Sequence, residues 1–202
     1  MHIDLVPLSP DATYAPMTRA LVPRPIARVT SRDEERGLEL APFSRFTTVS
    51  SDPPTILPSI GLHENGPPKG TRRNIEARHA FVVNIAHREM ATAMTASSAP
   101  LAPGASEIEA NGLATADMPG SSVPRLAECR VALACRYQAS QAVGRMAVIF
   151  AQVSHVWLDP AIVGTDGRGR MKVDTPALDP IGRLGGGEYL AGGEVFTIER
   201  PR

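Results

Sequence analysis

The sequence predicts a mainly β protein, a β-barrel or sandwich with short helical insertions, in a single domain over residues 1–202. Runs with strand-like hydrophobic patterns recur along the chain and short helical patterns separate them, while 17 glycines and 19 prolines provide turn residues. A chain of 202 residues can bury roughly 70% of its unfolded surface in one core, without disulfides or metals. No internal repeat and no shift in composition marks a domain boundary.

The first half of the chain is expected to form a hairpin, two further strands and a helix. The hairpin has a charged tip at residues 33–36. In a later strand Pro58 has no N–H to donate, which favours a sheet edge or a bulge. Thr71 is the expected N-cap of a helix that ends at Arg78. The four expected strands are residues 25–32, 37–44, 55–61 and 80–86.

The second half is expected to form two short helices and then strands. Residues 88–98 place apolar side chains at helical spacing, and residues 106–109 have the S-x-x-E pattern of a capping box, with Gly112 as the stop. The expected strands are residues 129–137, half-buried and antiparallel; residues 145–158, apolar on both faces and central in the sheet; and residues 195–199, short and last.

The two cysteines, Cys129 and Cys135, are interpreted as buried, reduced thiols. They lie six residues apart in a predicted strand. Six strand residues span about 20 Å at roughly 3.3 Å each, which is beyond the reach of a disulfide. Their spacing also lacks the C-x-x-C pattern of a metal site.

Composition and charge exclude several classes of protein. The 21 basic and 21 acidic side chains balance, and the pI is near 7.0, so the chain lacks the charge of a general nucleic-acid binder. No run of 18 apolar residues and no secretory signal pattern is present, which predicts no membrane partner and a cytoplasmic location.

Known catalytic motifs are absent from the sequence. It has no G-x-S-x-G, no H-E-x-x-H, no P-loop and no G-x-G-x-x-G. Its five histidines lack the spacing of metal ligands, so no metal site is expected. The glycine-rich segments GTDGRGR and LGGGEY could each hold a phosphate, although such segments are more often simple turns.

The segment KGTRRNI is the most informative candidate site. Lys69, Arg72 and Arg73 surround the start of a predicted helix, where the helix dipole already disfavours cations. A phosphate-sized anion would relieve this repulsion by binding the free backbone N–H groups, the Thr71 hydroxyl and the Lys69 ammonium. The alternative is a solvated basic helix start.

A second candidate is LAPFSRFTTVSSDPP, residues 40–54. Its small hydroxyl residues and backbone N–H groups lie beside two aromatic side chains, an arrangement that suits a flat heteroaromatic ligand with a polar edge. A strand followed by a proline-terminated turn would have the same sequence, so both readings remain open.

Four separated blocks, VPRPIARVTSRDEERGLELAPFSRFTTVSSDPP, KGTRRNI, AFVVNIA and LDPIGRLGGGEY, resemble the flavin reductase-like family of FMN-binding split-barrel proteins, which includes the flavoredoxins. The resemblance covers about residues 21–189 and implies a six-stranded antiparallel split β-barrel, a homodimer and FMN bound near the subunit interface. It also implies oxidation of NAD(P)H, with a hydride passing to flavin N5 and electrons passing onward. The cofactor carries this chemistry, so no catalytic side chain is expected.

The resemblance implies positions for the cofactor and the second substrate. Arg24, Thr30 and the backbone of Ala41, Pro42, Phe43 and Ser44 are expected at the flavin ring and ribityl chain. Ser50, Ser51, Lys69, Thr71 and Asn74 are expected at the ribityl and phosphate end. Arg183 and Tyr189 are expected to close over the site on the substrate or NAD(P)H side.

His155 has two readings, because it shares a strand face with apolar residues. It is either a core histidine or, by the resemblance, a residue beside the cofactor or NAD(P)H. The sequence also departs from the family's usual pattern: Arg28 and Arg45 stand where aromatics are common, Thr47 where Asn is common and Gly70 where Asp is frequent.

Two functions follow from the resemblance. One is an enzyme, an NAD(P)H-dependent flavin reductase or FMN-linked oxidoreductase. The alternative is a non-catalytic FMN carrier that passes electrons to an acceptor protein.

Overall fold

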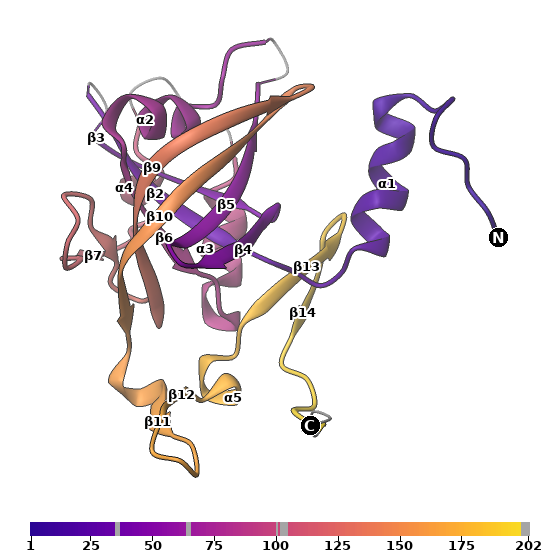
Figure 1. Ribbon diagram of the computed structural model, residues 1–202. Helices are drawn as coiled ribbons and strands as arrows, with labels where there is room; N and C mark the ends of the chain where they lie inside the picture. The colour runs from indigo at the N-terminus through magenta and orange to yellow at the C-terminus, as the bar shows by residue number, and fades with distance from the viewer. Residues whose placement is uncertain (35–36, 64–65, 100, 102–104, 199–202) are drawn as a thin grey trace.

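A computed structural model describes residues 1–34, 37–63, 66–99, 101 and 105–198. The mainly β class is confirmed, because a large antiparallel sheet forms the body of the molecule (Figure 1). The sheet has seven strands rather than the six that the resemblance implies. In spatial order they are β3 (Gly37–Phe43), β2 (Ala27–Asp33), β6 (Ala80–Ile85), β9 (Val131–Val143), β10 (Met146–Leu158), β5 (Pro54–Gly61) and β4 (Phe46–Ser51).

Smaller elements surround this sheet. A three-stranded sheet contains β1 (Arg24–Pro25), β13 (Ile181–Gly185) and β14 (Glu188–Ala191). Two further pairs are β7 (Thr115–Ala116) with β8 (Arg125–Leu126), and β11 (Val163–Thr165) with β12 (Met171–Val173). The α-helices are α1 (Pro10–Ala20), α2 (Gly70–Arg78), α3 (Ala91–Ala96), α4 (Glu107–Ala110) and α5 (Thr175–Leu178), and the 3₁₀ turns are η1 (Arg88–Met90) and η2 (Pro160–Ile162).

Apolar clusters cover both faces of the large sheet. On one face Val29, Phe81 and Ile149 pack with Ile75 of α2. On the other, Leu40, Val82 and residues 118–134 pack beneath Met90 of η1. The strand at residues 131–135 therefore has both faces covered, so the half-buried prediction is wrong there. The cause is a packing segment, residues 113–129, that crosses the outer face.

The strand predictions need three corrections. The segment that forms β4 is predicted only as a strand end and a turn, but it is a strand at the edge of the sheet. It pairs with the outer side of β5, so β5 is an interior strand and not the edge strand that Pro58 suggests. Pro58 is tolerated because the ladder between β5 and β10 is interrupted at residues 57–58. β10 is interior, although β9 is the middle strand. Residues 195–198 form no strand and are exposed, and Glu199 lies outside the described residues.

The helix boundaries also differ from expectation. Lys69, not Thr71, is the N-cap of α2, because the helix begins at Gly70. Ser106 is the N-cap of α4 as predicted, but its hydroxyl donates to the Leu38 carbonyl instead of capping the helix. The proline-rich start of the chain forms α1, with Ser9 accepting from the Ala12 N–H as its cap. Residues 35–36 of the predicted hairpin tip lie outside the described residues.

Within the described chain, no helix is both long enough and apolar enough to cross a membrane.

Both cysteines are buried and unpaired, as predicted. Burial raises the pKa of Cys129 to about 11 and that of Cys135 to about 12. The thiols are therefore protonated at neutral pH and are poor nucleophiles.

The buried thiols should make the fold less stable at alkaline pH. Unfolded thiols ionise near 9.0, whereas the folded thiols keep their protons until the pH approaches 11 to 12. The free energy of unfolding should therefore fall as pH rises above 9.0, by at most about 1.4 kcal/mol per pH unit for each thiol. Urea unfolding at neutral and alkaline pH should show that the free energy of unfolding falls less with pH in the double variant Cys129→Ala/Cys135→Ala than in the wild type. An equal loss in both proteins would contradict this assignment.

Candidate functional site

The larger of two adjoining cavities lies where the end of β3 meets the start of α2. Its volume of about 630 Å³ is within the range of small-molecule sites. Five predicted site residues line it: Ala41, Pro42, Phe43, Lys69 and Thr71. The other lining residues are Glu39, Leu62, His63, Gly70, Arg73, Ser97, Ser98, Ala99, Leu101, Ala105 and Glu107.

The start of α2 brings unpaired cations to this cavity. Lys69 and Arg73 are exposed, and neither forms an ion pair with another residue that the structure describes. The Lys69 side chain makes no capping hydrogen bond, and the first turn contains no acid. Arg72, in contrast, turns along the helix and donates to Glu76 at 3.0 Å. The predicted anion site therefore keeps two of its three cations.

The two carboxylates in the larger cavity are already engaged by the protein. Glu39 is 8% exposed, and its Oε2 accepts from Asn74 Nδ2 at 2.9 Å. Glu107 Oε2 accepts from the Leu40 N–H at 3.2 Å. Because Glu39 is buried beneath the start of α2 and the cations lie on the exposed side, Lys69 and Arg73 remain available to an external anion.

Gly70 allows the Glu39 carboxylate to approach α2. A Cβ at this position would lie 2.5 Å from Glu39 Oε2. The sequence departure at residue 70 is thus explained: a carboxylate reaches the start of α2 from β3, and a side chain at residue 70 would displace it.

The second cavity, of about 210 Å³, lies between α1, α3 and the β13–β14 hairpin. Four predicted site residues line it: Pro42, Ser44, Arg183 and Tyr189. Its other lining residues are Tyr14, Ile26, Met94, Thr95 and Ser98. Pro42 and Ser98 belong to both cavities, so the two join at the end of β3.

Some predicted side chains make internal contacts instead. Thr30 Oγ1 accepts from Asn84 Nδ2 at 2.8 Å, and Asn74 joins Ser31 to Glu39. Arg24 donates to the carbonyls of Thr18 and Leu21 at the end of α1. None of these three lines either cavity.

Three further predicted residues also lie away from the two cavities. Ser50 and Ser51 are exposed on the edge strand β4, where the Ser50 hydroxyl contacts the backbone of Asp52. His155 is exposed on β10 and lies against Gly120, so it is not a core histidine. It lines neither cavity.

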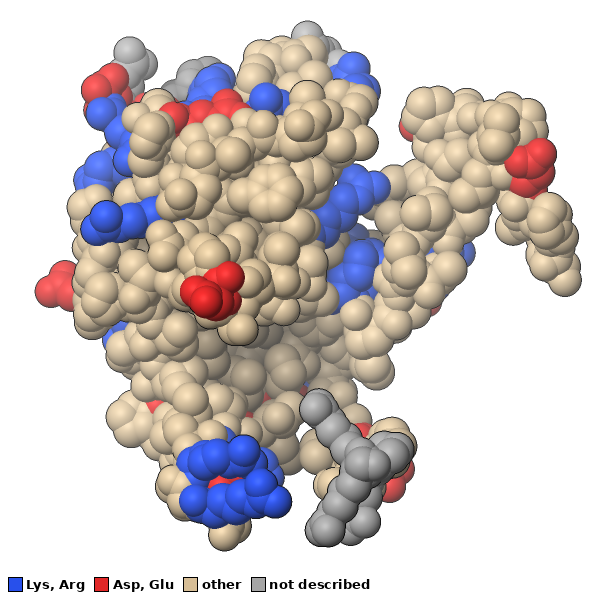
Figure 2. All heavy atoms as spheres, viewed as in Figure 1, with Lys and Arg blue, Asp and Glu red and all other residues tan. Residues whose placement is uncertain are grey.

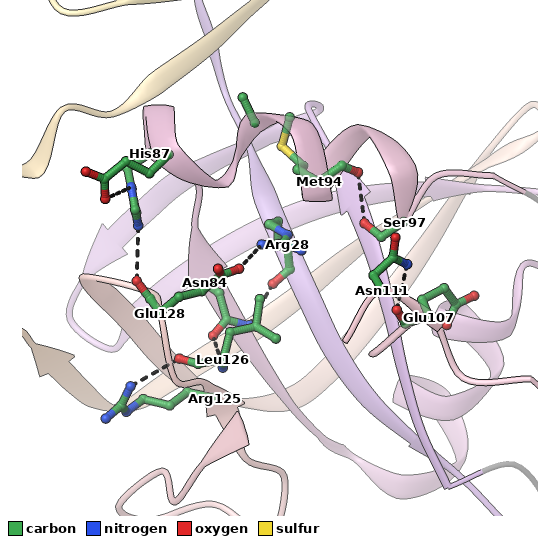
Figure 3. Close-up of polar contacts among 12 residues, drawn as sticks. Arg28, Asn84, His87, Met94, Ser97, Glu107, Asn111, Arg125, Leu126 and Glu128 are labelled. Atoms are coloured by element: carbon green, nitrogen blue, oxygen red, sulfur yellow. Dashed lines mark hydrogen bonds and ion pairs between the residues drawn. The ribbon is translucent and has the colours of Figure 1, made fainter. Parts of the chain in front are cut away.

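Arg28 and Arg45, the two arginines at positions where aromatic residues are common, differ in their burial. Arg28 is fully buried and donates to Glu128 at 2.9 Å (Figure 3). Burial lowers the pKa of its guanidinium, and the hydrogen bond to Glu128 opposes this shift. Arg45 is exposed, with its guanidinium 5.8 Å from the centroid of the Tyr14 ring. Arg28 therefore does not crowd the cavities, whereas Arg45 lies near the smaller one.

Sequence reasoning missed the walls that α1 and α3 provide. Thr95, Ser97 and Ser98 lie at the end of a segment predicted only as helix, and Tyr14 lies in a segment given no element. Ser97 and Ser98, which follow the amphipathic segment, are the feature of the sequence that could have placed the end of α3 at the site. For Tyr14 no local pattern points to a ligand. Among the described residues no group of three or more potential metal ligands comes together.

Comparison with known families gives one match over most of the chain. The model of the flavin reductase like domain matches residues 17–172. An uncharacterised protein of Halalkalibacterium halodurans is 34% identical over 200 residues, which cover 96% of this chain and 93% of that protein.

Solved structures show the same fold. Nitrilotriacetate monooxygenase component B from Bacillus cereus has a TM-score of 0.87 at 28% identity, covering 98% of each chain. The 2-nitrobenzoate 2-nitroreductase of Pseudomonas fluorescens has a TM-score of 0.87 at 26% identity, covering 100% of this chain and 96% of the other. A putative flavin reductase with a split barrel domain from Shewanella frigidimarina has a TM-score of 0.83 at 18% identity over all of both chains, which identifies the fold as a split barrel.

Replacing Gly70 with alanine should destabilise the protein. The new Cβ would displace the buried Glu39 carboxylate and disturb the hydrogen bond that it accepts from Asn74, and the loss of such a bond costs about 1 kcal/mol. Gly164→Ala is the matched control, because no atom lies within 4 Å of its would-be Cβ. Urea unfolding should show a loss in the first variant only. Equal stability of the two variants would show that Glu39 moves freely.

Proposed function

The chain belongs to the flavin reductase like domain family, and on that premise we propose that it is an FMN-dependent oxidoreductase that accepts electrons from NAD(P)H. Membership of the family makes it a flavin-related oxidoreductase or carrier. FMN, NAD(P)H and the choice of enzyme over carrier are the proposed parts.

One observation carries this function. In the larger cavity, two exposed cations at the start of α2, Lys69 and Arg73, lie beside the wall formed by Ala41 to Phe43. A phosphate fits the first, because Lys69, Arg73 and the backbone N–H groups of the first turn of α2 are all donors. A flat ring fits the second, where Phe43 and Pro42 provide apolar surface beside backbone polar groups. FMN carries both groups in one molecule.

Within this arrangement each group of residues has a definite task. Lys69 and Arg73 would bind the phosphate, and Thr71 would add a hydroxyl. Backbone groups of Ala41 to Phe43 would orient the ring. The chemistry of hydride acceptance and onward electron transfer would come from FMN when it is bound. Donors aimed at the ring's polar edge would stabilise the negative charge that it gains on reduction.

The smaller cavity favours an enzyme over a carrier. A reductase needs space beside the flavin for a second molecule, whereas a carrier can cover its flavin. The smaller cavity joins the larger at Pro42 and Ser98 and thus provides such space. Two of the similar structures are named as a monooxygenase component and a nitroreductase, which agrees with an enzyme.

The deciding experiment adds NADH or NADPH to the FMN-loaded protein without oxygen. An enzyme should lose the yellow absorbance of oxidised flavin within seconds to minutes, and air should restore it. Free FMN at the same concentration is the control. Protein that stays yellow with both nucleotides, but is reduced by dithionite, would favour the carrier.

Lys69→Ala should weaken FMN binding. Loss of a charge-assisted hydrogen bond costs about 1.5 to 3 kcal/mol, so the Kd for FMN should rise roughly ten- to a hundredfold. Riboflavin, which lacks the phosphate, should lose much less affinity. Lys172→Ala in β12 removes the chain's other lysine, outside both cavities, and should leave both ligands unaffected.

Fluorescence titration of the two flavins into wild type and both variants measures these affinities. Unchanged FMN affinity in Lys69→Ala would mean that the start of α2 is merely solvated. Equal losses for FMN and riboflavin would mean that Lys69 contacts the ring or supports the fold.

A further inference from the structure

The smaller cavity contains one charged side chain in a neutral surrounding. Arg183 is the charged member of its lining, among the residues that the structure describes. The hydroxyls of Ser44, Thr95 and Tyr189 provide polar contacts, and Ile26 and Met94 provide apolar ones. A cation with hydroxyls at one side and apolar surface at the other suits a molecule with an anionic group and an apolar body.

The charge of Arg183 is not neutralised by the protein. Its guanidinium donates to the Tyr189 hydroxyl and to the Gly186 carbonyl, both uncharged, and lies 4.7 Å from the centroid of the Tyr189 ring. No carboxylate in the described part of the chain forms an ion pair with it. Since a guanidinium has five N–H groups, donors remain for a ligand, and the contacts to Tyr189 and Gly186 fix its orientation.

Other arginines strengthen the positive potential around this cavity. Arg24 is the direct partner of Arg183 across the antiparallel β1–β13 pair, so both side chains leave the same face. Arg45 lies over Tyr14 on the α1 side. Figure 2 shows Lys and Arg side chains gathered between α1 and the body of the molecule. In a chain with no net charge, this concentration of cations favours an anion.

The walls of this cavity come partly from outside the segment that matches the family model. Tyr14, Arg183 and Tyr189 lie beyond residues 17–172, which match the family model, whereas the lining residues of the larger cavity lie within them. The larger cavity is thus lined within the matched segment alone, whereas the smaller one also uses residues on both sides of it.

We infer that the smaller cavity binds the anionic group, a carboxylate or a phosphate, of the second substrate, with Arg183 as its ion-pair partner. Tyr189 holds the guanidinium in place, and Ile26 and Met94 contact the apolar part. This rests on the proposed function, because the second substrate is the molecule that meets FMN where the cavities join. The anion has two sources: the carboxylate of an aromatic electron acceptor, or the phosphate of the nicotinamide nucleotide.

Calorimetric titration of FMN-loaded protein with two matched pairs of probes tests this inference. Benzoate against benzamide compares a carboxylate with a neutral group of the same shape. Nicotinamide mononucleotide against nicotinamide riboside compares the presence and absence of a phosphate. At least one anionic probe should bind tenfold or more tightly than its neutral partner, and which pair shows the preference identifies the source.

The preference should depend on Arg183. Arg183→Gln should abolish it and Arg183→Lys should keep part of it. Arg168→Gln, on an exposed turn outside both cavities, should keep all of it. The Kd for FMN should stay unchanged in Arg183→Gln, which shows that the larger cavity is intact.

Equal binding of the anionic and neutral probes in the wild type, or an unchanged preference in Arg183→Gln, would overturn the inference. Calorimetry detects the probes with or without flavin. Failure of the proposed function, seen as no FMN binding, is therefore distinguishable from failure of the anion subsite, seen as no Arg183-dependent preference.

Discussion

The buried amide of Asn74 fixes the geometry on which the larger cavity depends. Its Nδ2 donates to Ser31 Oγ at 3.1 Å and to Glu39 Oε2 at 2.9 Å, joining α2 to β2 and β3. A buried polar group that loses its partners costs about 1 to 3 kcal/mol, so α2 cannot rotate about its axis without penalty. Ile75, the next residue, is held in the core. Together these contacts aim the start of α2, with Lys69 and Arg73, at the end of β3.

The side chains of β2 alternate between the apolar core on one face of the sheet and buried polar groups on the other. Ala27 and Val29 point into the apolar cluster, while Arg28 and Thr30 point to the outer face and are equally buried. On the outer face the Arg28 guanidinium donates to Glu128 (Figure 3). Asn84 Nδ2 donates to the Arg28 carbonyl and to Thr30 Oγ1. Arg28 is the buried member of this pair and Glu128 is 41% exposed, so removing Glu128 would leave a buried charge without its partner, which is costly. Arg28 therefore anchors the segment around Glu128 over the sheet rather than serving a ligand.

The sequence predicted best where local chemistry decides the outcome. Lys69 and Thr71 were predicted from charge at a helix start, and Ala41 to Phe43 from a strand end beside hydroxyl residues. Both are local signals, and the structure places all five residues in the lining of the larger cavity. β4 was missed because Thr47 to Ser51 are all exposed and, apart from Val49, polar, so the strand has no apolar alternation. Thr30 and Asn74 are predicted at the cofactor. Their side chains make internal hydrogen bonds and line neither cavity, which no local pattern reveals. The smaller cavity was not predictable as a unit, because Tyr14, Met94 and Arg183 meet only through tertiary folding.

The two ends of the chain are joined to each other as well as to the body. Arg24 donates to the last carbonyls of α1, where a cation is favoured by the helix dipole, and Arg19 of α1 packs against Gly185 of β13. Ile26, Met94 and Ile181 connect this assembly to α3 in a cluster separate from the main core. Side chains of α1 and of the β13–β14 hairpin that face the smaller cavity can therefore change without repacking the large sheet or moving α2. The lining of the larger cavity can stay constant while that of the smaller one diverges.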